Sequence, residues 1–488
     1  MDSVLATGKS FKELERKIYD RCLEVAREFV KYFLEKKDEE LAGQRDKKEL
    51  RKIDKRTRTV KTIMGEVEIQ RSLYRRRKEG STTEYVYLLD DFLEEEVIGT
   101  VSSNLLEVIA DRICEKTYRQ TAKDIEVITG QSISHQAVWD IVQKIGARLE
   151  REEIRKINSD YQEKGKEKKK EIQILFEEGD GMWLPMQGAD RPQKGNGRRE
   201  MKLGSFYEGW EKRHPCSEEY RTVGKIVYGG YMDGKTFGQL RDMKVAEHYN
   251  LDEIHYRILN GDGAAWIRQG NDTGNEIFQL DPYHLSKAVL RNVRDKKACT
   301  ELLGWLKQGH TEKALERIES LKYECGGLAG EVKKLQELEK YIRGNREGIG
   351  SYKDKIDWDR LEKKEGLEYR NLGTMERNVG LFGRRMSGPM SWSRQGATHL
   401  AKILALKISG KLETGLAEVM SGKLPELTEE KKERPLLRPK DFSRGESGKK
   451  EYRVQRGRIP YENSAITLGR KAIRDLFNYR GFGDMGFQ

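Results

Sequence analysis

The sequence predicts an α+β protein of several domains: a helical N-terminal region, a mixed α/β core and an all-helical insertion. Three observations favour this fold class. Apolar residues recur at helix spacing near the N-terminus, short apolar runs typical of strands lie between about residues 172 and 259, and helix spacing returns between about 295 and 365. The 488 residues allow about two to four domains.

The first 100 residues are predicted to form a helix followed by a β-hairpin. The helix spans residues 10–36, and one face carries Phe11, Leu14, Ile18, Cys22, Val25, Phe29 and Phe33. The hairpin spans Arg58 to Arg77 and turns at Met64-Gly65-Glu66. Its last residues, Arg75, Arg76 and Arg77, could contact DNA phosphates. A solvated edge strand, protected from aggregation by charge, is the alternative.

Residues 101–165 are predicted to be a helical region that binds DNA. Thr117 to Val142 contains a short helix, a break at Gly130, and a second helix capped by Ser132 or Ser134. This pattern predicts a helix-turn-helix whose second helix enters a major groove, with Ser134, His135 and Gln136 as DNA contacts. Helical hairpins also occur in proteins that bind no DNA.

Strand-like runs follow a charge-dense linker at residues 151–170. We expect strands at Ile172 to Phe176, Met182 to Met186 as its hairpin partner, Met201 to Tyr207, Thr222 to Tyr228, and Ile254 to Leu259. The helical insertion is predicted from Leu315, Ile318 and Leu321, and from Val332, Leu335, Leu338 and Ile342. The predicted domains are 1–100, 101–165, a core at 166–294 and 366–420, the insertion at 295–365, and a tail at 421–488. That basic tail is expected to be partly disordered or wrapped on the body, with a short helix at Ala465 to Phe477.

Charge and cysteine content narrow the setting in which the protein works. The chain has 94 Lys and Arg against 82 Asp and Glu, a net charge of +12, and 36% of its residues are charged. A basic surface favours nucleic acid as a partner, although high solubility alone would also explain it. Five scattered cysteines and no long apolar run predict a reducing, cytoplasmic location and no membrane span.

Two apolar strands run directly into the tripeptide Gly-Asp-Gly. The first contains Asp180 and the second Asp262. A carboxylate at a strand end is held firmly, and flanking glycines allow a phosphate and its metal ions to approach. An Asx turn after a strand is the alternative, but two such sites make a shared function more plausible.

A third carboxylate would complete a site for metal-dependent phosphoryl transfer. Two divalent cations about 4 Å apart activate the attacking oxygen and stabilise the leaving oxygen, and carboxylates are the ligands that Mg²⁺ prefers. The best candidate is Glu376, which opens a basic segment with Arg377, Arg384 and Arg385 as DNA contacts. Glu362, Glu365 and Glu368 compete by spacing, but their surroundings suggest a solvent-facing helix.

Several motifs together resemble the DDE transposases of bacterial insertion sequences, most closely the Mutator-like ISLre-two group. They are Arg58-Thr-Val-Lys-Thr-Ile-Met-Gly-Glu-Val, Glu178-Gly-Asp-Gly, Gly261-Asp-Gly-Ala-Ala-Trp-Ile, Leu280-Asp-Pro-Tyr-His, Met375-Glu-Arg-Asn and Met390-Ser-Trp-Ser-Arg-Gln-Gly-Ala. The resemblance covers most of the chain. It implies a ribonuclease H-like core with an all-helical insertion, and Asp180, Asp262 and Glu376 as catalytic metal ligands.

One departure from that group concerns the residues that follow the second aspartate. The wider Mutator-like group has Cys-x-x-His there, whereas this chain has Asp281-Pro-Tyr-His284. His284 could orient DNA or support the metal site, or be a structural group. Trp392 presents a similar choice between stacking on a base and filling the core.

The expected function is that of a transposase that binds the terminal inverted repeats of its insertion sequence and cuts and joins DNA. It would use Mg²⁺ or Mn²⁺, with two ions bound, and act on double-stranded terminal and target DNA. A homodimer or larger synaptic assembly in the bacterial cytoplasm, at the nucleoid, is expected. Two alternatives remain: a metal-dependent nuclease or resolvase of the same fold, and a DNA-binding protein without catalysis.

Overall fold

The structure is a computed structural model of the chain. It describes residues 10–77, 83–93, 97–98, 100–158, 169–269, 276–326, 328–362 and 366–421. These residues all belong to one compact unit, Met1–Lys423. The predicted tail and its short helix at 465–477 lie outside the described residues.

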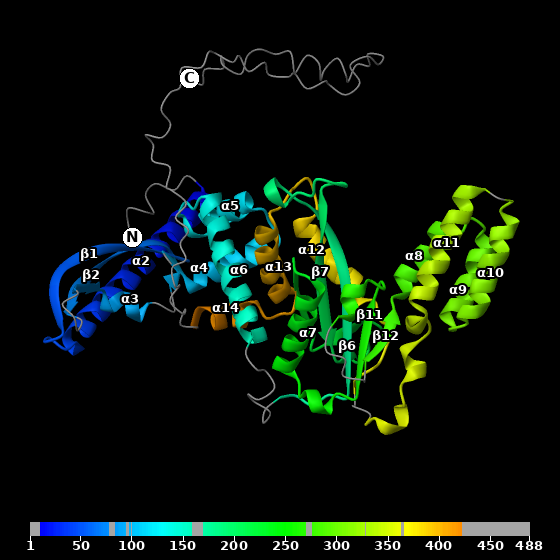
Figure 1. Cartoon of the computed structure of the whole chain (residues 1–488). Helices are drawn as coiled ribbons and strands as arrows, with labels where there is room; N and C mark the ends of the chain where they lie inside the picture. The colour runs from blue at the N-terminus through cyan, green and yellow to red at the C-terminus, as the bar shows by residue number, and fades with distance from the viewer. Residues whose placement is uncertain are drawn as a thin grey trace, which may run out of the picture. The chain divides into compact units, whose positions relative to one another are not determined.

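The N-terminal part combines one long helix with a five-stranded sheet, drawn in blue in Figure 1. Its elements are α2 (Phe11–Gln44), β1 (Leu50–Thr62), β2 (Gly65–Arg77), β3 (Thr83–Val86), α3 (Leu88–Phe92), β4 (Val97–Ile98) and β5 (Val101–Ser102). The sheet order is β3-β2-β1-β5-β4, and the predicted hairpin is β1 and β2, paired from Thr62 and Gly65 outward. Gly65 adopts a φ of +116°, which favours glycine.

Helix α2 packs on this sheet through a face that the sequence analysis did not select. Leu34 is buried together with Val67 and Ile69, and the buried carboxylate of Asp38 accepts hydrogen bonds from the N–H and hydroxyl of Ser72. The predicted helix is confirmed, but Phe11, Val25 and Phe29 of the predicted packing stripe are exposed. Apolar residues at three- and four-residue steps predict a helix. Because α2 has two apolar faces, this spacing does not predict which of them packs on the sheet.

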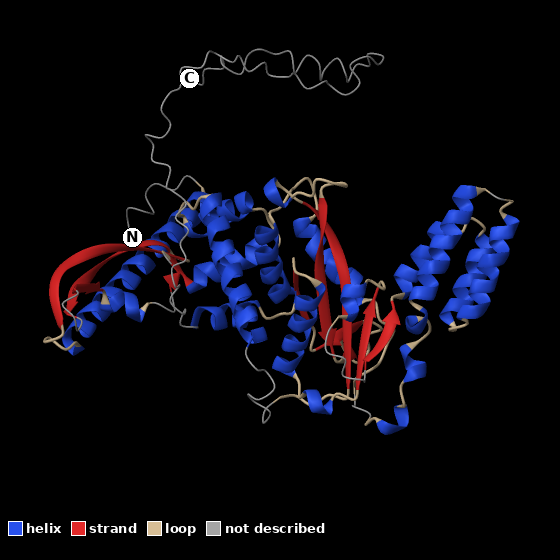
Figure 2. Ribbon diagram, viewed as in Figure 1, coloured by secondary structure: helices blue, strands red, loops and turns tan. Residues whose placement is uncertain are grey.

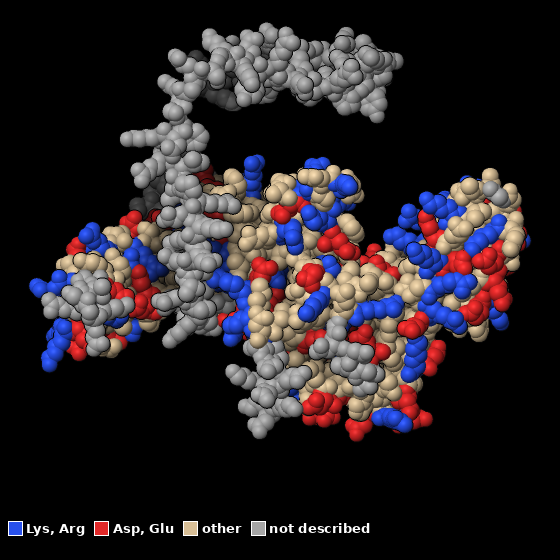
Figure 3. Space-filling view, in the orientation of Figure 1, with Lys and Arg blue, Asp and Glu red and all other residues tan. Residues whose placement is uncertain are grey.

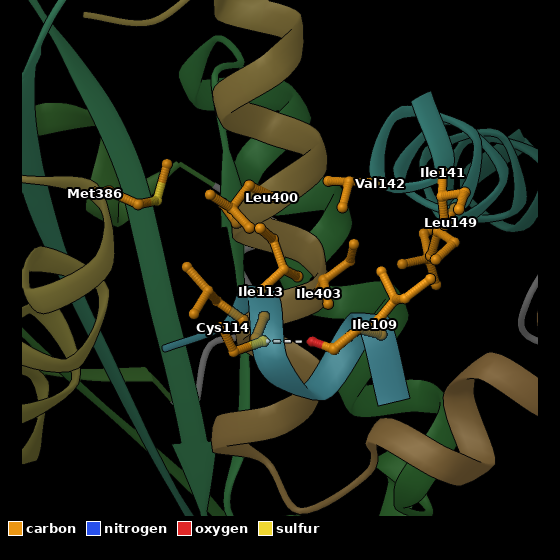
Figure 4. Packing of buried hydrophobic residues seen from close by; sticks show 14 of the residues in the cluster. Ile109, Ile113, Cys114, Ile141, Val142, Leu149, Met386, Leu400 and Ile403 are labelled. Carbon is orange, nitrogen blue, oxygen red and sulfur yellow. Dashed lines mark hydrogen bonds between the residues drawn. The ribbon is translucent and has the colours of Figure 1, made fainter. Parts of the chain in front are cut away.

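A helical layer follows the N-terminal sheet. It contains α4 (Ser103–Ile113), α5 (Tyr118–Thr129), α6 (His135–Asn158), α13 (Arg394–Ile408) and α14 (Leu412–Ser421). Figure 4 shows Ile109, Ile113, Ile141, Val142 and Leu400 converging from α4, α6 and α13 into one apolar core. Thr117 caps α5 in a capping box with Gln120, and Gly130 ends it in the left-handed conformation. Helix α6 continues to Asn158, into the predicted linker.

A second five-stranded sheet forms the centre of the molecule, shown as red arrows in Figure 2. Its strands are β6 (Ile174–Pro185), β7 (Arg198–Tyr207), β10 (Ile226–Gly230), β11 (Tyr256–Gly261) and β12 (Glu276–Leu280), in the order β10-β7-β6-β11-β12. Only β7 runs antiparallel to its neighbours. A short antiparallel pair, β8 (Gly209–Lys212) and β9 (Tyr220–Val223), lies apart from it. The mixed α/β class is therefore confirmed.

Two predicted strand boundaries in this sheet are wrong. The predicted hairpin of residues 172–176 and 182–186 is the single strand β6, because its glycines stay extended and pair with Gly204 and Lys202 of β7. The predicted strand 222–228 is split between β9 and β10 at Gly224, whose φ of +64° bends the chain.

Alternate residues of the central strands face two different helical layers. One face, with Leu175 and Phe206, packs against Phe237 and Leu240 of α7 (Gly234–His248). On the other face Met182 and Leu203 share a core with α13 and with α12 (Thr374–Met386). The sheet is thus buried on both sides, and the polar residues in its strands must find partners inside the protein.

Four helices interrupt the sequence between β12 and α12. They are α8 (Pro282–Asn292), α9 (Lys296–Lys307), α10 (Thr311–Glu324) and α11 (Ala329–Gly344), which share one apolar core and form the bundle in Figure 1. The predicted helical residues Leu315, Ile318, Leu335 and Leu338 are buried in this core. After Gly344 the chain forms only short 3-10 turns up to Arg360, and the described residues around Glu362 and Glu368 are not the solvent-facing helix expected there. Among the described residues, no helix is long and apolar enough to cross a membrane.

Candidate functional site

Strand β6 carries three acidic residues that point to different faces of the sheet. Glu177 faces α7, where it forms buried ion pairs with Arg241 and Arg257. Glu178 and Asp180 face the layer that contains α12, because side chains two residues apart share one side of a strand. Asp180 lies within the strand rather than at its end, but the pairing of β6 with β11 stops at Glu178. The side chain of Asp180 is therefore beyond the last parallel pair.

Glu178 holds the N-terminus of α12 against the sheet. Its buried carboxylate accepts hydrogen bonds from the backbone N–H groups of Gly373, Thr374 and Met375, at 3.0 to 3.1 Å. The hydroxyls of Thr374 and Tyr207 and the amide of Asn260 also donate to it. The helix has no side-chain cap of its own, since its N-cap residue is Gly373. Glu178 supplies that cap from β6, with a negative charge that the helix dipole favours.

This anchoring places Glu376, in the first turn of α12, beside Asp180. One ligand atom each of Asp180, His284 and Glu376 lies within 4.8 Å of the others, which is close enough for a shared metal ion. The imidazole Nε2 of His284 is 3.9 Å from a carboxylate oxygen of Asp180. Asp180 is buried, His284 is half-buried and Glu376 is exposed, so the cluster opens to solvent on the side of α12.

The electrostatic setting of Asp180 is unfavourable for a carboxylate without a cation. Burial raises the pKa of Asp180 to about 6, against the lowering effects of His284 and of the hydrogen bond from Gly181 N–H. The charges of Asp262 and Glu376 contribute to the same rise in the pKa. A buried group that other carboxylates surround is more stable once a cation binds, because the cation offsets both the desolvation and the repulsion.

Asp262 directly follows β11 and approaches the cluster from the neighbouring strand. It is not one of the three residues whose ligand atoms lie within 4.8 Å, but its charge acts on Asp180. Its backbone carbonyl accepts a hydrogen bond of 2.8 Å from the hydroxyl of Tyr341 in α11. Gly261 packs so closely on Ile267 that a Cβ atom there would lie 2.6 Å from the Ile267 Cδ1. The glycine therefore permits Ile267 to pack closely against the end of β11, next to Asp262.

His284 is positioned by the start of α8. The carboxylate of Asp281 caps this helix by accepting the N–H groups of Tyr283 and His284, and Pro282 occupies the first turn. Asp281 also accepts a hydrogen bond from Asn260, the residue that donates to Glu178. One buried amide thus links the helix that carries His284 to the carboxylate that anchors the helix of Glu376.

The donor set of the cluster fits a divalent metal ion. Two carboxylates with open coordination positions suit Mg²⁺ or Mn²⁺, and an imidazole favours Mn²⁺ over Mg²⁺ because nitrogen is a softer ligand than oxygen. These side chains come from a strand and from the first turns of two helices, so their backbones are fixed by regular hydrogen bonding.

A basic cavity of about 820 Å³ lies on another side of α12. Among the residues that line it, Lys225, Arg377 and Lys411 form no ion pair with any acidic residue in the described part of the chain. Burial and the neighbouring Arg377 lower the pKa of Lys225. Elsewhere the charges are mixed, and Figure 3 shows Lys and Arg interspersed with Asp and Glu over the visible face. The cavity therefore holds three cations that acidic groups in the described part of the chain do not neutralise.

The predicted DNA-contact residues occupy very different environments. Ser134, His135 and Gln136 are exposed at the start of α6, where the Ser134 hydroxyl accepts the N–H of Ala137. Arg75 and Arg76 are half-buried on β2, and the side chain of Arg77 lies outside the described residues.

Within and after α12, the structure separates surface residues from core residues. Arg377 and Arg384 are exposed, whereas Arg385 is buried, donates to the Ile113 carbonyl and lies over the Tyr118 and Trp392 rings. The predicted DNA contact by Arg385 is therefore wrong, because its guanidinium fills the interior. Trp392 is also buried, and its indole N–H donates to the Met386 carbonyl. Of the two predicted roles, stacking on a base or filling the core, the structure therefore supports the second.

Glu178 and Asn260 also belong to the site, although they were not predicted from the sequence. Both lie inside apolar strands, Glu178 after Leu175 and Phe176 and Asn260 after Ile258 and Leu259. Polar residues in a strand that is buried on both faces require internal partners, and this pattern was the available signal.

Comparison with known proteins gives the family. A family described as "Uncharacterised protein family (UPF0236)" matches residues 4–421. The chain belongs to the UPF0236 family. A UPF0236 protein of Caldanaerobacter subterraneus subsp. tengcongensis is 24% identical over 86% of this chain and 82% of its own length. A second from the same strain is 25% identical over 86% of this chain and 83% of its own. A "UPF0236 protein in vanSb 3'region" of Streptococcus gallolyticus is 23% identical over 84% and 86%.

The UPF0236 match corrects the assignment that the motifs suggested. The resemblance placed the chain among the ISLre-two transposases, but the matching family is UPF0236, and the relatives carry that name and no transposase description. Gly-Asp-Gly is a short motif, and its two copies here have different structures, since the first lies within β6 and the second begins with the last residue of β11. They locate acidic residues in a UPF0236 chain, but they do not decide its family.

Proposed function

We propose that this UPF0236 protein is a transposase that cleaves DNA strands and joins them to target DNA with the help of divalent metal ions. The observation that carries the proposal is the approach of Asp180, His284 and Glu376 to within a shared ion's reach, with Asp262 acting on the same carboxylate. Phosphodiester cleavage and joining need activated oxygen nucleophiles and stabilised oxygen leaving groups, and bound divalent cations supply both.

In this proposal the four residues have distinct roles. Asp180 and Glu376 would hold the metal, Asp262 would contribute a further carboxylate, and His284 would support Asp180 from the start of α8. Mg²⁺ or Mn²⁺ is the proposed cofactor, with two ions bound. Glu178 is a positioning residue, because it acts on the site through α12.

The basic cavity beside α12 is a suitable path for the DNA backbone. Arg377 follows Glu376 in the same helix and lines this cavity with Lys225 and Lys411. Phosphate groups would neutralise these cations, which the described protein groups do not. The hairpin of α5 and α6 is the proposed helix-turn-helix, and the exposed Ser134, His135 and Gln136 are its proposed contacts with the terminal repeats.

The fold and the names of the relatives support the proposal in two further ways. A mixed sheet with acidic residues on adjacent parallel strands, followed by a helical insertion and a helix with a third acid, fits a ribonuclease H-like core. The name of the first Caldanaerobacter relative joins eleven locus designations, as expected for a gene that is copied within one genome. A DNA substrate implies action in the bacterial cytoplasm, at the nucleoid.

Strand cleavage and joining can be tested with the purified full chain. The substrate is a linear duplex that carries the gene and its flanking DNA, incubated with a target plasmid and either Mn²⁺ or Mg²⁺. We expect joined products with the wild-type protein and none with Asp262→Asn, while the affinity for DNA stays within about threefold. Cleavage without joining would favour a nuclease, and unchanged cleavage by the variant would refute the assigned site.

The DNA path can be tested by the salt dependence of binding. Arg377→Gln should weaken binding to duplexes of any sequence and reduce the slope of log affinity against log salt by about one. Arg360→Gln, an exposed arginine that pairs with Asp357, is the matched control and should leave the slope unchanged. An unchanged slope for Arg377→Gln would remove the cavity from the DNA path without affecting the metal site.

A further inference from the structure

Helix α2 presents an apolar face on the side that points away from its own sheet. Phe29 is 71% exposed and Val25 is 46% exposed, and Phe11, Ile18 and Tyr32 on the same side are also exposed. Leu34, which packs on the sheet, lies about 160° around the helix from Ile18, at 3.6 residues per turn. The helix thus has two opposite apolar faces, of which the described part of the chain covers one.

The open face is large enough for a stable protein contact. The 34 residues of α2 extend for about 50 Å, a length that accommodates the roughly 800 Å² per partner of an ordinary specific interface. A hollow of about 520 Å³ lies on this face, lined by Arg21, Glu24, Val25, Glu28, Phe29 and Tyr32. A contiguous apolar patch of this kind, bordered by charged residues, is typical of a surface that binds another protein.

The charges along the face select a second copy of the same chain as the partner. Arg21, which also pairs with Glu24 of its own helix, borders the apolar face toward the N-terminal end, and Glu28 borders the same margin toward the C-terminal end. In an antiparallel pair related by a twofold axis near Val25, Arg21 of each copy meets Glu28 of the other. In a parallel pair both charges would face the opposite margin, which carries the uncharged Ala26 and Phe33 at this level.

We propose that the protein is a homodimer in which the α2 helices of two copies pack antiparallel through this face. Phe29 and Tyr32 of one copy then pack beside Ile18 and Cys22 of the other, and the two Val25 side chains meet at the twofold axis. In this dimer Leu34 and its face of α2 stay packed on the N-terminal sheet of their own copy. Dimerisation therefore requires no change in the fold of either copy. The proposal does not depend on the catalytic assignment.

The dimer face can be tested by sedimentation of the full-length protein. We expect the wild type to sediment as a dimer at micromolar concentration and Phe29→Glu as a monomer, because each copy would place a charge in the apolar contact. Tyr323→Glu, a substitution at an exposed tyrosine of α10, is the control and should remain dimeric. Both variants should keep the wild-type circular dichroism spectrum, since neither side chain is buried within a single copy. The melting temperature of Phe29→Glu should fall only by the stabilisation that dimerisation adds to the wild type. A wild-type monomer, or a dimeric Phe29→Glu, would overturn the proposal and leave the face to another segment or another protein.

A charge exchange tests the antiparallel arrangement separately. Arg21→Glu and Glu28→Arg should each weaken dimerisation, by about tenfold, because each creates two like-charge contacts across the axis. The double variant Arg21→Glu/Glu28→Arg should restore the wild-type dissociation constant, because the exchanged charges meet again. Two weak single variants without restoration in the double variant would refute the antiparallel pairing.

Discussion

Strand β6 carries buried carboxylates on both of its faces, but in the described part of the chain only those on one face are neutralised by arginine. Glu177, on the face toward α7, lies between Arg241 and Arg257, and Asp242 binds the same guanidinium groups. Burial would lower the pKa of Arg257, but Glu177 and Asp242 outweigh it and raise that pKa. Each buried charge on this face therefore has an opposite charge within the protein.

Asp180, three residues along the same strand, forms no ion pair with an arginine or lysine among the described residues. Its neighbours are His284, Glu376 and the charge of Asp262, and its pKa is raised by burial and by the two acids. Burial of a carboxylate alone therefore does not mark a functional site. A functional site is indicated where the protein leaves the charge for an external cation to neutralise.

Breaking the compensated face should have the largest effect on stability. Arg257→Met removes one partner of Glu177 and leaves a carboxylate that is buried without enough opposing charge, at a cost of about 3–5 kcal/mol in the free energy of unfolding. Urea denaturation followed by circular dichroism measures the loss. Arg221→Met, which breaks the exposed pair with Glu211, is the control and should cost less than about 1 kcal/mol. Equal losses in the two variants would contradict the distinction.

Loosening the anchor of α12 should affect both stability and metal binding. In Glu178→Gln an amide N–H₂ replaces one acceptor oxygen and faces the N–H groups of α12, so we expect a loss of about 2–3 kcal/mol. Mn²⁺ affinity, measured by calorimetry on the folded variant, should also fall, because Glu376 is no longer held beside Asp180. A variant that loses stability but binds Mn²⁺ as the wild type does would show that Glu178 is structural only.

Much of this arrangement could be predicted from the sequence, and the remainder has a physical explanation. The helix spacing of Leu315, Ile318 and Leu335 identified the insertion, and the Gly-Asp-Gly tripeptides identified Asp180 and Asp262, because both signals depend on local geometry. The role of Glu178 depends on Gly373, 195 residues away, so no local pattern contains it. The role of Arg385 is likewise absent from any local pattern. Its basic neighbours suggested a DNA contact, but its side chain points into the core and donates to the Ile113 carbonyl.

The uncompensated face should make stability depend on pH in the absence of metal. The pKa of Asp180 is raised from 3.8 to about 6 on folding, so the folded protein holds this proton more tightly than the unfolded chain. The stabilising contribution is therefore fully present below about pH 4 and is lost as pH rises through 6, about 3 kcal/mol in all. Unfolding in urea from pH 4 to 8 with EDTA, compared between wild type and Asp180→Asn, isolates this contribution. A wild-type minus variant difference that is constant with pH would contradict the raised pKa.

Removing the charge of Asp180 should produce the smallest effect and the most diagnostic one. Asp180→Asn ends the repulsion from Glu376 and Asp262, so at pH 8 without metal it should raise the free energy of unfolding by about 1 kcal/mol. The gain is smaller than the pH effect because an amide oxygen accepts the Gly181 N–H less strongly than a carboxylate.

Mn²⁺ should reverse the order of stability of these two proteins. It should bind the folded wild type and stabilise it by mass action, whereas the Asp180→Asn site lacks one ligand for the ion. Mn²⁺ should stabilise Arg257→Met by the same amount as it stabilises the wild type, because Glu177 lies on the other face of the sheet and the metal ligands are unchanged. If Mn²⁺ stabilises wild type and Asp180→Asn equally, the ion binds elsewhere, and Asp180 is then a strained buried carboxylate without a metal role.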